Sequence, residues 1–215
     1  MIDFSHIEKY RENNRIEAKR ALGGLPKSIW ETYSAFANTL GGIILLGVVE
    51  TGDKTFDTVD LPDPEGLIRE FRSILNDPKK VSVNILSDDD VYVQEVNGDR
   101  IVVINVPRAS RADMPVYVDG DPLYGTYRRS GEGDYRCTRE ECLAMARDAA
   151  AYSAPENRQR IIEYLTDHVE ARPTELAKVL RISAPKTRAV LARLSDQNIV
   201  TSDGGARNRK YRLKA

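Results

Sequence analysis

The chain has 215 residues, 41% of them hydrophobic, and a formal net charge of −1. This length allows one large or two modest domains, and the composition argues against an intrinsically disordered chain. No apolar run reaches the roughly 18–20 residues that span a bilayer. The polar N-terminus "MIDFSHIEKY" is unlike a signal peptide. We therefore expect no membrane association and a cytoplasmic location.

The chain holds few sulfur or imidazole ligands for a metal. Its only cysteines are Cys137 and Cys142, and its only histidines are His6 and His168. Because zinc sites require three or four protein ligands, we expect all four side chains to be structural or incidental. The phosphate-binding pattern G-x-x-x-x-G-K-[ST] does not occur. We therefore expect no cofactor and no ATP-dependent activity.

Helix-like and strand-like segments alternate in the first part of the chain. Apolar residues at helical spacing predict helices over 25–39 and 64–75, the first with Pro26 near its start and Gly41-Gly42 after its end. Short apolar or alternating runs predict strands at 15–19, 43–50, 81–86, 90–96 and 99–106. This order indicates an α+β fold with a mixed sheet and flanking helices.

Two residue pairs with strong turn preference predict hairpins in the same part of the chain. Asn97-Gly98 separates two of the predicted strands, and Asp119-Gly120 lies within the segment 116–129. Both pairs accept the positive φ angles that two-residue hairpin turns require.

A capped helix and a proline mark the end of this first part. Thr138 and Glu141 fit the T-x-x-E capping box of a helix at 139–151. Pro155 then interrupts the helix-like alanine run. We predict two domains, 1–152 and 155–215.

The second domain is predicted to contain helices at 156–169, 173–180 and 185–198, followed by two short strands within 199–213. Ser183 is suited to cap the third helix. The pattern "TELAKVLRIS…KTRAVLARLSDQNIV…GG…RKYRL" resembles winged helix-turn-helix DNA-binding domains over nearly all of 156–215. The resemblance implies that the third helix enters the major groove and that the hairpin wing contacts the DNA backbone.

Charge is unevenly distributed between the two domains. From Glu156 onward the chain has thirteen lysines and arginines and seven acidic residues, a net charge of about +6, against about −7 for the remainder. A basic module of this kind favours a polyanionic partner. A winged helix that only makes protein contacts, with a solvated basic face, is the alternative.

Periodicity assigns the faces of this second domain. The residues predicted to pack inward are Val190, Leu191, Leu194 and Ile199, against Ile161, Leu165, Leu176 and Leu180. The residues predicted to contact DNA are Pro185, Lys186, Arg188 and Arg193 on the helix and Arg207, Arg209, Lys210 and Arg212 on the wing. Lys186 and Arg188 lie near the helix start, where base edges are reached, whereas the wing charges suit phosphates.

The first domain carries the segments "RENNRIEAK", "SAFANTLGGIILLGVVE" and "YGTYRRSGEGDYRCT". Together they resemble the Schlafen/AlbA-type domain over roughly residues 5–147, with "FANTLGG" followed by "GV" carrying most of the specificity. The resemblance implies nucleic-acid binding and transcriptional regulation. Some Schlafen proteins are instead endoribonucleases, and their catalytic acidic positions match Glu12, Glu17 and Glu50 in this chain.

Glu12 and Glu17 can converge only under one condition. Whether the segment is a helix or an uninterrupted strand, the two side chains point away from each other. The chain must therefore bend at Asn13-Asn14 for them to meet. Glu17 and Lys19 share a face if 15–19 is a strand. Converging with Glu50, the glutamates could bind Mg²⁺ or Mn²⁺, and Lys19 could orient water or stabilise charge. The alternative is an ordinary solvated surface.

The segment "YRRSGEGDY" is a second candidate site. Arg128 and Arg129 precede a glycine-containing loop whose backbone amides could hold a phosphate. The alternative is a glycine-rich turn with solvated arginines. We interpret Asn38 and Thr39 as capping residues at a helix end rather than catalytic residues.

The preferred interpretation is a transcriptional regulator that binds duplex DNA through its winged helix. The alternatives are a metal-dependent endoribonuclease using Glu12, Glu17 and Glu50, with RNA as its partner, and a ligand- or partner-sensing module without catalysis. A homodimer is compatible with the first interpretation, because such DNA readers commonly bind paired half-sites.

Overall fold

The computed structural model describes residues 2–205 and 209–214, except for the side chains of 151–155 and 185. The chain forms two compact units, one of Met1–Ser110 and Met114–Leu143 and the other of Arg111–Asp113 and Ala144–Ala215. No helix in the described part of the chain is long and apolar enough to cross a membrane.

The division between the units falls inside helix α4 (Arg139–Asp167). The sequence predicted two helices here, separated at Pro155, but the structure has one continuous helix. The flanking residues "DAAAYSA" and "ENRQR" include strong helix formers, which continue the helix across the single missing N–H of the proline. The predicted capping box at its start is present, since Glu141 accepts from the Thr138 amide and Thr138 accepts from that of Glu141.

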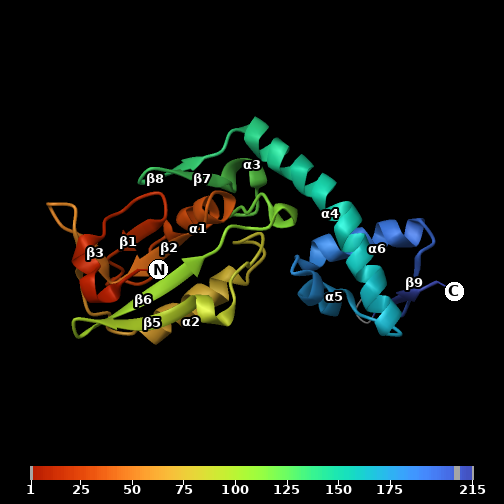
Figure 1. Cartoon of the computed structure of the whole chain (residues 1–215), viewed down its shortest axis with the longest axis horizontal. Coiled ribbons are helices and arrows are strands. Elements are labelled where there is room, and N and C mark those ends of the chain that lie inside the picture. The colour runs from red at the N-terminus through yellow and green to blue at the C-terminus, as the bar shows by residue number, and fades with distance from the viewer. Residues whose placement is uncertain (1, 206–208, 215) are drawn as a thin grey trace. The chain divides into compact units, whose positions relative to one another are not determined.

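A four-stranded mixed sheet forms the centre of the first unit, in the order β1-β2-β6-β5 (Figure 1). Its strands are β1 (Ile16–Lys19), β2 (Gly42–Leu46), β5 (Val91–Val96) and β6 (Asp99–Val106). Strands β1 and β2 are parallel and are joined through helix α1 (Ile29–Asn38), whereas the other pairs are antiparallel. The Asn97-Gly98 hairpin between β5 and β6 is confirmed, and both residues have positive φ.

Both faces of this sheet are covered, which explains the continuous apolar run of β2. Ile44 and Leu46 pack in a cluster with α1 and with α2 (Pro64–Leu75), where Trp30 and Phe71 stack at 5.1 Å between ring centroids. Leu45 packs on the opposite face in a second cluster. Alternate residues of one strand therefore serve two cores.

Smaller elements surround the sheet. They are η1 (Phe4–Lys9), β3 (Val48–Glu50), β4 (Phe56–Thr58), η2 (Asp88–Asp90), η3 (Arg111–Asp113), α3 (Pro122–Gly125), β7 (Tyr127–Ser130) and β8 (Gly133–Arg136). Strands β3 and β4 form one antiparallel pair, and β7 and β8 form another.

Three sequence predictions for the first unit were wrong in detail. The run 43–50 is not one strand, because Gly47 has φ +85° and breaks it into β2 and β3. Residues 81–86 form no strand and make only an isolated bridge, at Val81. Asp119 and Gly120 do turn the chain, but the residues after them form α3, so the hairpin of this region is β7–β8.

The second unit contains the later part of α4, then α5 (Pro173–Leu180), α6 (Ala184–Asp196), β9 (Val200–Asp203) and β10 (Lys210–Leu213). Strands β9 and β10 form an antiparallel hairpin. The elements follow one another in the predicted order, and α5 has the predicted bounds. The predicted inward residues all contribute to one core: Ile161, Leu165, Leu176, Leu180, Val190, Leu191, Leu194 and Ile199.

Candidate functional site

The segment before β1 makes the reversal that convergence of Glu12 and Glu17 required. Asn13 pairs with Ile16 in an isolated antiparallel bridge, and the Asn13 side chain accepts from the Arg15 amide at 2.8 Å. Glu12 therefore lies beside β1, where its Oε1 accepts from the Ala18 amide at 3.0 Å. The predicted bend is confirmed.

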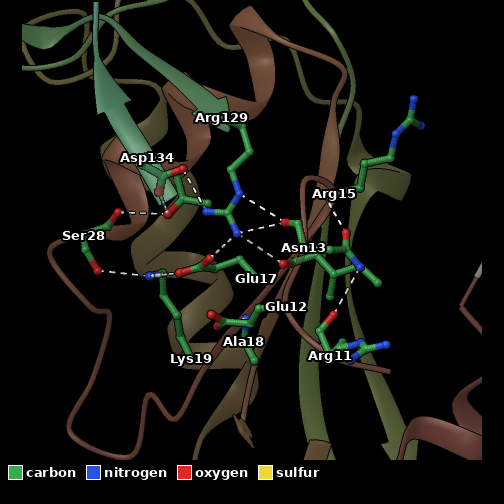
Figure 2. A network of polar contacts seen from close by, with 12 residues as sticks. Arg11, Glu12, Asn13, Arg15, Glu17, Ala18, Lys19, Ser28, Arg129 and Asp134 are labelled. Carbon is green, nitrogen blue, oxygen red and sulfur yellow. Dashed lines mark hydrogen bonds and ion pairs between the residues drawn. The ribbon is translucent and has the colours of Figure 1, made fainter. Parts of the chain in front are cut away.

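Glu17 is held between two cations. Its Oε1 accepts from Lys19 Nζ at 2.8 Å, and its Oε2 accepts from Arg129 Nη2 at 2.7 Å (Figure 2). Lys19 also donates to Ser28 Oγ at 3.1 Å. Glu17 and Lys19 thus share one face of a strand, as their spacing predicted, but both carboxylate oxygens are already engaged.

Arg129 is the centre of this network. Its side chain is only 1% exposed and reaches Glu17, Asp134 at 2.9 Å and the Asn13 carbonyl, with Phe36 beneath the guanidinium. Burial lowers the pKa of Arg129, but the two carboxylates more than offset this and hold its pKa above the ordinary value. Since the partners come from four segments, the arginine links the N-terminal turn, β1, α1 and the β7–β8 hairpin. Figure 2 shows the partners Asn13, Glu17 and Asp134.

This placement does not support the phosphate-binding role predicted for Arg129. The segment "YRRSGEGDY" is a hairpin rather than a loop, and successive residues of β7 point to opposite faces. Arg129 consequently faces the interior, whereas Arg128 is exposed and pairs with Glu141 at 3.1 Å. Arg128 keeps its predicted role as a candidate ligand-binding residue.

Glu17 and Glu50 both lie within electrostatic reach of Glu12. Burial raises the pKa of Glu12 above its ordinary value of 4.5, the negative charges of Glu17 and Glu50 add to this rise, and the Ala18 amide opposes it. Among the described residues, however, no group of three acidic, histidine or cysteine side chains is arranged to hold a metal ion. With Glu17 held by two cations, this donor set does not fit a divalent metal.

The shifted pKa of Glu12 predicts a pH dependence of stability. A carboxyl whose folded-state pKa lies above its unfolded value binds more protons when folded, so it lowers stability as pH rises through that interval. Glu12→Gln keeps an oxygen for the Ala18 amide and removes the charge. We expect the variant to unfold at higher denaturant concentration than wild type at pH 7, and the difference to shrink near pH 4. An unchanged difference at both pH values would contradict this assignment.

The residues predicted to contact DNA divide into several groups. Arg188, Arg193 and Arg209 are exposed. Lys210 pairs with Glu170, and Arg212 lies 3.5 Å from Asp203. Arg207 and the side chain of Pro185 lie outside the described residues.

Lys186 differs from the other predicted DNA contacts. It is partly buried, donates to the Ala112 carbonyl and lies 3.8 Å from Asp113. Burial lowers the pKa of Lys186, and Asp113 opposes this effect. The amine therefore has protein partners in this structure.

Asn38 has a role that the sequence interpretation missed. It is the last residue of α1, but it does not cap that helix: its side chain bonds the amide and carbonyl of Val116 at 2.8 and 2.7 Å and the Tyr127 carbonyl at 3.1 Å. Thr39 is the C-cap residue, and its hydroxyl accepts from the Arg129 amide. Both residues join α1 to the segment that positions Arg129. Their position beside the glycine pair favoured a local interpretation, and no spacing signal pointed to these distant partners.

The two thiols are both buried and free. Burial raises the pKa of Cys137 to about 12, so it is an unreactive thiol at neutral pH. The His168 ring stacks on the Tyr164 ring with 4.0 Å between the ring centroids, and its Nδ1 contacts the Tyr164 carbonyl.

The first unit is therefore an α+β domain whose N-terminal turn is tied to a β-hairpin by a buried arginine. The family model described as "Schlafen, AlbA_2" matches residues 12–138, which contain this entire network. Because the match covers more than half of the chain, the protein belongs to the Schlafen/AlbA_2 family. The family resemblance predicted from "FANTLGG" is confirmed.

Two solved structures are similar to this chain. One is the N-terminal domain of a RecG-related protein from Nitrosomonas europaea, with 32% identity, a TM-score of 0.48, and coverage of 64% of this chain and 95% of that one. The other is the DIP2311 protein from Corynebacterium diphtheriae, with 20% identity, a TM-score of 0.42, and coverage of 62% of this chain and 24% of that one. No curated protein matches the sequence.

Proposed function

We propose that this protein binds duplex DNA through its second unit, as a winged helix, and acts as a transcriptional regulator. Its family is associated with nucleic-acid binding. The observation that carries the proposal is the set of exposed arginines on a unit of net charge about +6, in a chain whose total is −1. Such a local excess of positive charge favours a polyanion.

Helix and hairpin are assigned different tasks in this proposal. Arg188 is exposed on the first part of α6, the second helix of the helix-turn-helix, and is the candidate for base contact. Arg209 is exposed immediately before β10 and is the candidate for phosphate contact. Lys186 is the weaker candidate for base contact because it is partly buried against Ala112 and Asp113.

These tasks predict different mutant behaviour. Arg188→Ala should weaken binding to a selected duplex by about 1–3 kcal/mol and relax its sequence preference. Arg209→Ala should weaken all duplexes alike and reduce the slope of log affinity against log salt by about one unit. Titrations of selected and scrambled duplexes at several salt concentrations measure both effects.

A matched control comes from the first unit. Arg69→Ala removes an exposed arginine of α2 that pairs with Asp63, and it should leave both the affinity and the salt slope unchanged. If Arg209→Ala behaves like Arg69→Ala, the wing does not contact phosphates. If wild type binds no duplex at low salt, the proposed function is wrong.

A metal-dependent endoribonuclease is the second candidate, favoured by the negative charges of Glu17 and Glu50 that act on Glu12. Both carboxylate oxygens of Glu17 are engaged by Lys19 and Arg129, which argues against metal binding by these glutamates. We therefore expect no cleavage of structured RNA in Mn²⁺ or Mg²⁺. Glu50 is exposed at the end of β3, and Glu50→Gln should leave the fold intact. If wild type cleaves RNA and Glu50→Gln does not, the nuclease becomes the proposed function in place of the transcriptional regulator.

A further inference from the structure

A pocket lies on the β7–β8 hairpin of the first unit, with a volume of about 380 Å³. The buried Arg129 and the exposed Arg136 contribute to its lining. The lining residues that concern the proposal are Arg128 and Tyr135 on the two strands and Glu141 in the first turn of α4. The volume falls in the range of about 300–1,000 Å³ found for small-molecule sites. None of these three residues takes part in the network around Arg129.

Tyr135 forms an aromatic wall of this pocket. It lies directly opposite Arg128 across the hairpin, so the two side chains share a face. A side chain at Gly133 would come within 2.7 Å of the Tyr135 ring, which shows that the ring lies against the glycine. The tyrosine is nevertheless 61% exposed, and an exposed ring supported on one side offers its other surface for stacking.

Arg128 and Glu141 place a donor beside an acceptor. Arg128 Nη1 lies 3.1 Å from Glu141 Oε1, while Oε2 of the same carboxylate accepts from the Thr138 amide at 2.8 Å. The capping box of α4 therefore fixes the carboxylate, and the carboxylate fixes the guanidinium. Both side chains remain about half exposed, at 50% and 41%, and both keep unused hydrogen-bonding capacity for a ligand.

We propose that this pocket binds an unpaired guanine base, stacked on Tyr135 and held at its edge by Arg128 and Glu141. Guanine differs from the other nucleobases in carrying two adjacent donors, N1–H and the 2-amino group, beside the acceptor O6, so it complements a carboxylate beside a guanidinium. Proteins recognise unpaired bases by this combination of aromatic stacking and edge hydrogen bonds. The site goes beyond the proposed function, which concerns duplex DNA and the other unit.

The test uses the full-length protein and two sources of guanine. One source is guanosine monophosphate, compared with the adenosine, cytidine and uridine monophosphates by calorimetry. The other is a fluorescent single-stranded oligouridine with one central guanine, compared with oligouridine alone by anisotropy. Tyr135→Ala should weaken guanine binding by roughly 5- to 150-fold. Tyr135→Phe, which keeps the ring, should retain it.

Two further variants separate the site from general effects. Glu141→Gln preserves the capping box, because glutamine is accepted at that position, and should reduce the preference for guanine over adenine by roughly tenfold. Tyr124→Ala is the matched control, since Tyr124 is 66% exposed but does not line the pocket, and it should bind as wild type does. Duplex binding should be unchanged in Tyr135→Ala, so this inference and the proposed function can fail separately.

Each outcome decides the inference. Guanine-selective binding of the monophosphate identifies a free-nucleotide site, and guanine-selective binding of the oligonucleotide alone identifies a single-strand site. No preference for guanine in either form, or equal effects of Tyr135→Ala and Tyr124→Ala, overturns the proposal.

Discussion

Replacing Arg129 with alanine should lower the free energy of unfolding by about 3–5 kcal/mol, the cost of removing one partner from a buried ion pair. The guanidinium is 1% exposed, and the Glu17 and Asp134 side chains that it neutralises are 12% and 13% exposed. Without the arginine, the carboxylates of Glu17 and Asp134 would remain mostly buried without the positive charge that now pairs with both of them. Urea unfolding followed by circular dichroism measures this loss.

The neighbouring arginine provides the control. Arg128→Ala removes a half-exposed ion pair on the other face of the same strand, and it should change stability by about 0–1 kcal/mol. Arg129→Lys keeps a charge but cannot form the same fork of hydrogen bonds, so its stability should fall between those of wild type and Arg129→Ala. Equal losses in Arg128→Ala and Arg129→Ala would show that burial does not amplify the ion pair.

The Arg129 network also constrains the acidic residues that resemble a nuclease centre. Glu17 is bound on one oxygen by Lys19 and on the other by Arg129. Binding a metal through Glu17 would require this network to open, at a cost similar to that of losing the buried pair. The same residues that resemble catalytic ligands thus stabilise the N-terminal turn in this structure.

Local signals in the sequence predicted much of the fold. The helix at 64–75 has the predicted bounds, because its proline at the first position and its amphipathic pattern are properties of the segment itself. The β5–β6 hairpin follows from Asn97-Gly98 in the same way. Predictions depending on tertiary context were weaker: 81–86 has strand-like composition, yet it makes only one bridge, at Val81.

In the candidate site, too, contacts between residues close in sequence could be predicted and contacts between distant residues could not. The shared face of Glu17 and Lys19 and the reversal after Glu12 could be predicted, since both concern residues close in sequence. The contact of Glu17 with Arg129 could not, because 112 residues separate them. Pattern and spacing indicate what a segment can do locally, but they do not identify which distant charge neutralises a buried one.

The second large effect is expected at Asn38. Its buried side chain is 5% exposed and connects α1 to Val116 and Tyr127 through hydrogen bonds at both of its polar atoms. Asn38→Ala should leave the Val116 amide and the Tyr127 carbonyl without this partner, each costing about 1–3 kcal/mol when unsatisfied, whereas the Val116 carbonyl still accepts from Ser34 Oγ. We expect a total loss of about 3 kcal/mol or more.

An asparagine at the end of the other long helix of this unit is the matched control for Asn38. Asn76 follows α2 and is exposed; its side chain donates to the Arg72 carbonyl and accepts from the exposed Asn84 amide group, so Asn76→Ala should cost no more than about 1 kcal/mol. If Asn38→Ala loses no more stability than Asn76→Ala, the hydrogen bonds of Asn38 contribute little to stability.

Asn38→Asp tests which of these bonds matters. Aspartate keeps an acceptor for the Val116 amide but places a negative oxygen against the Val116 and Tyr127 carbonyls. Only the protonated acid can donate to a carbonyl, so the folded state raises the pKa of this carboxyl, and stability falls as pH rises through the interval above its unfolded value. The variant should therefore be least stable at neutral pH and recover part of its stability near pH 4, relative to wild type at each pH. If its deficit does not change with pH, the donor side of Asn38 is not what holds the β7 segment to α1.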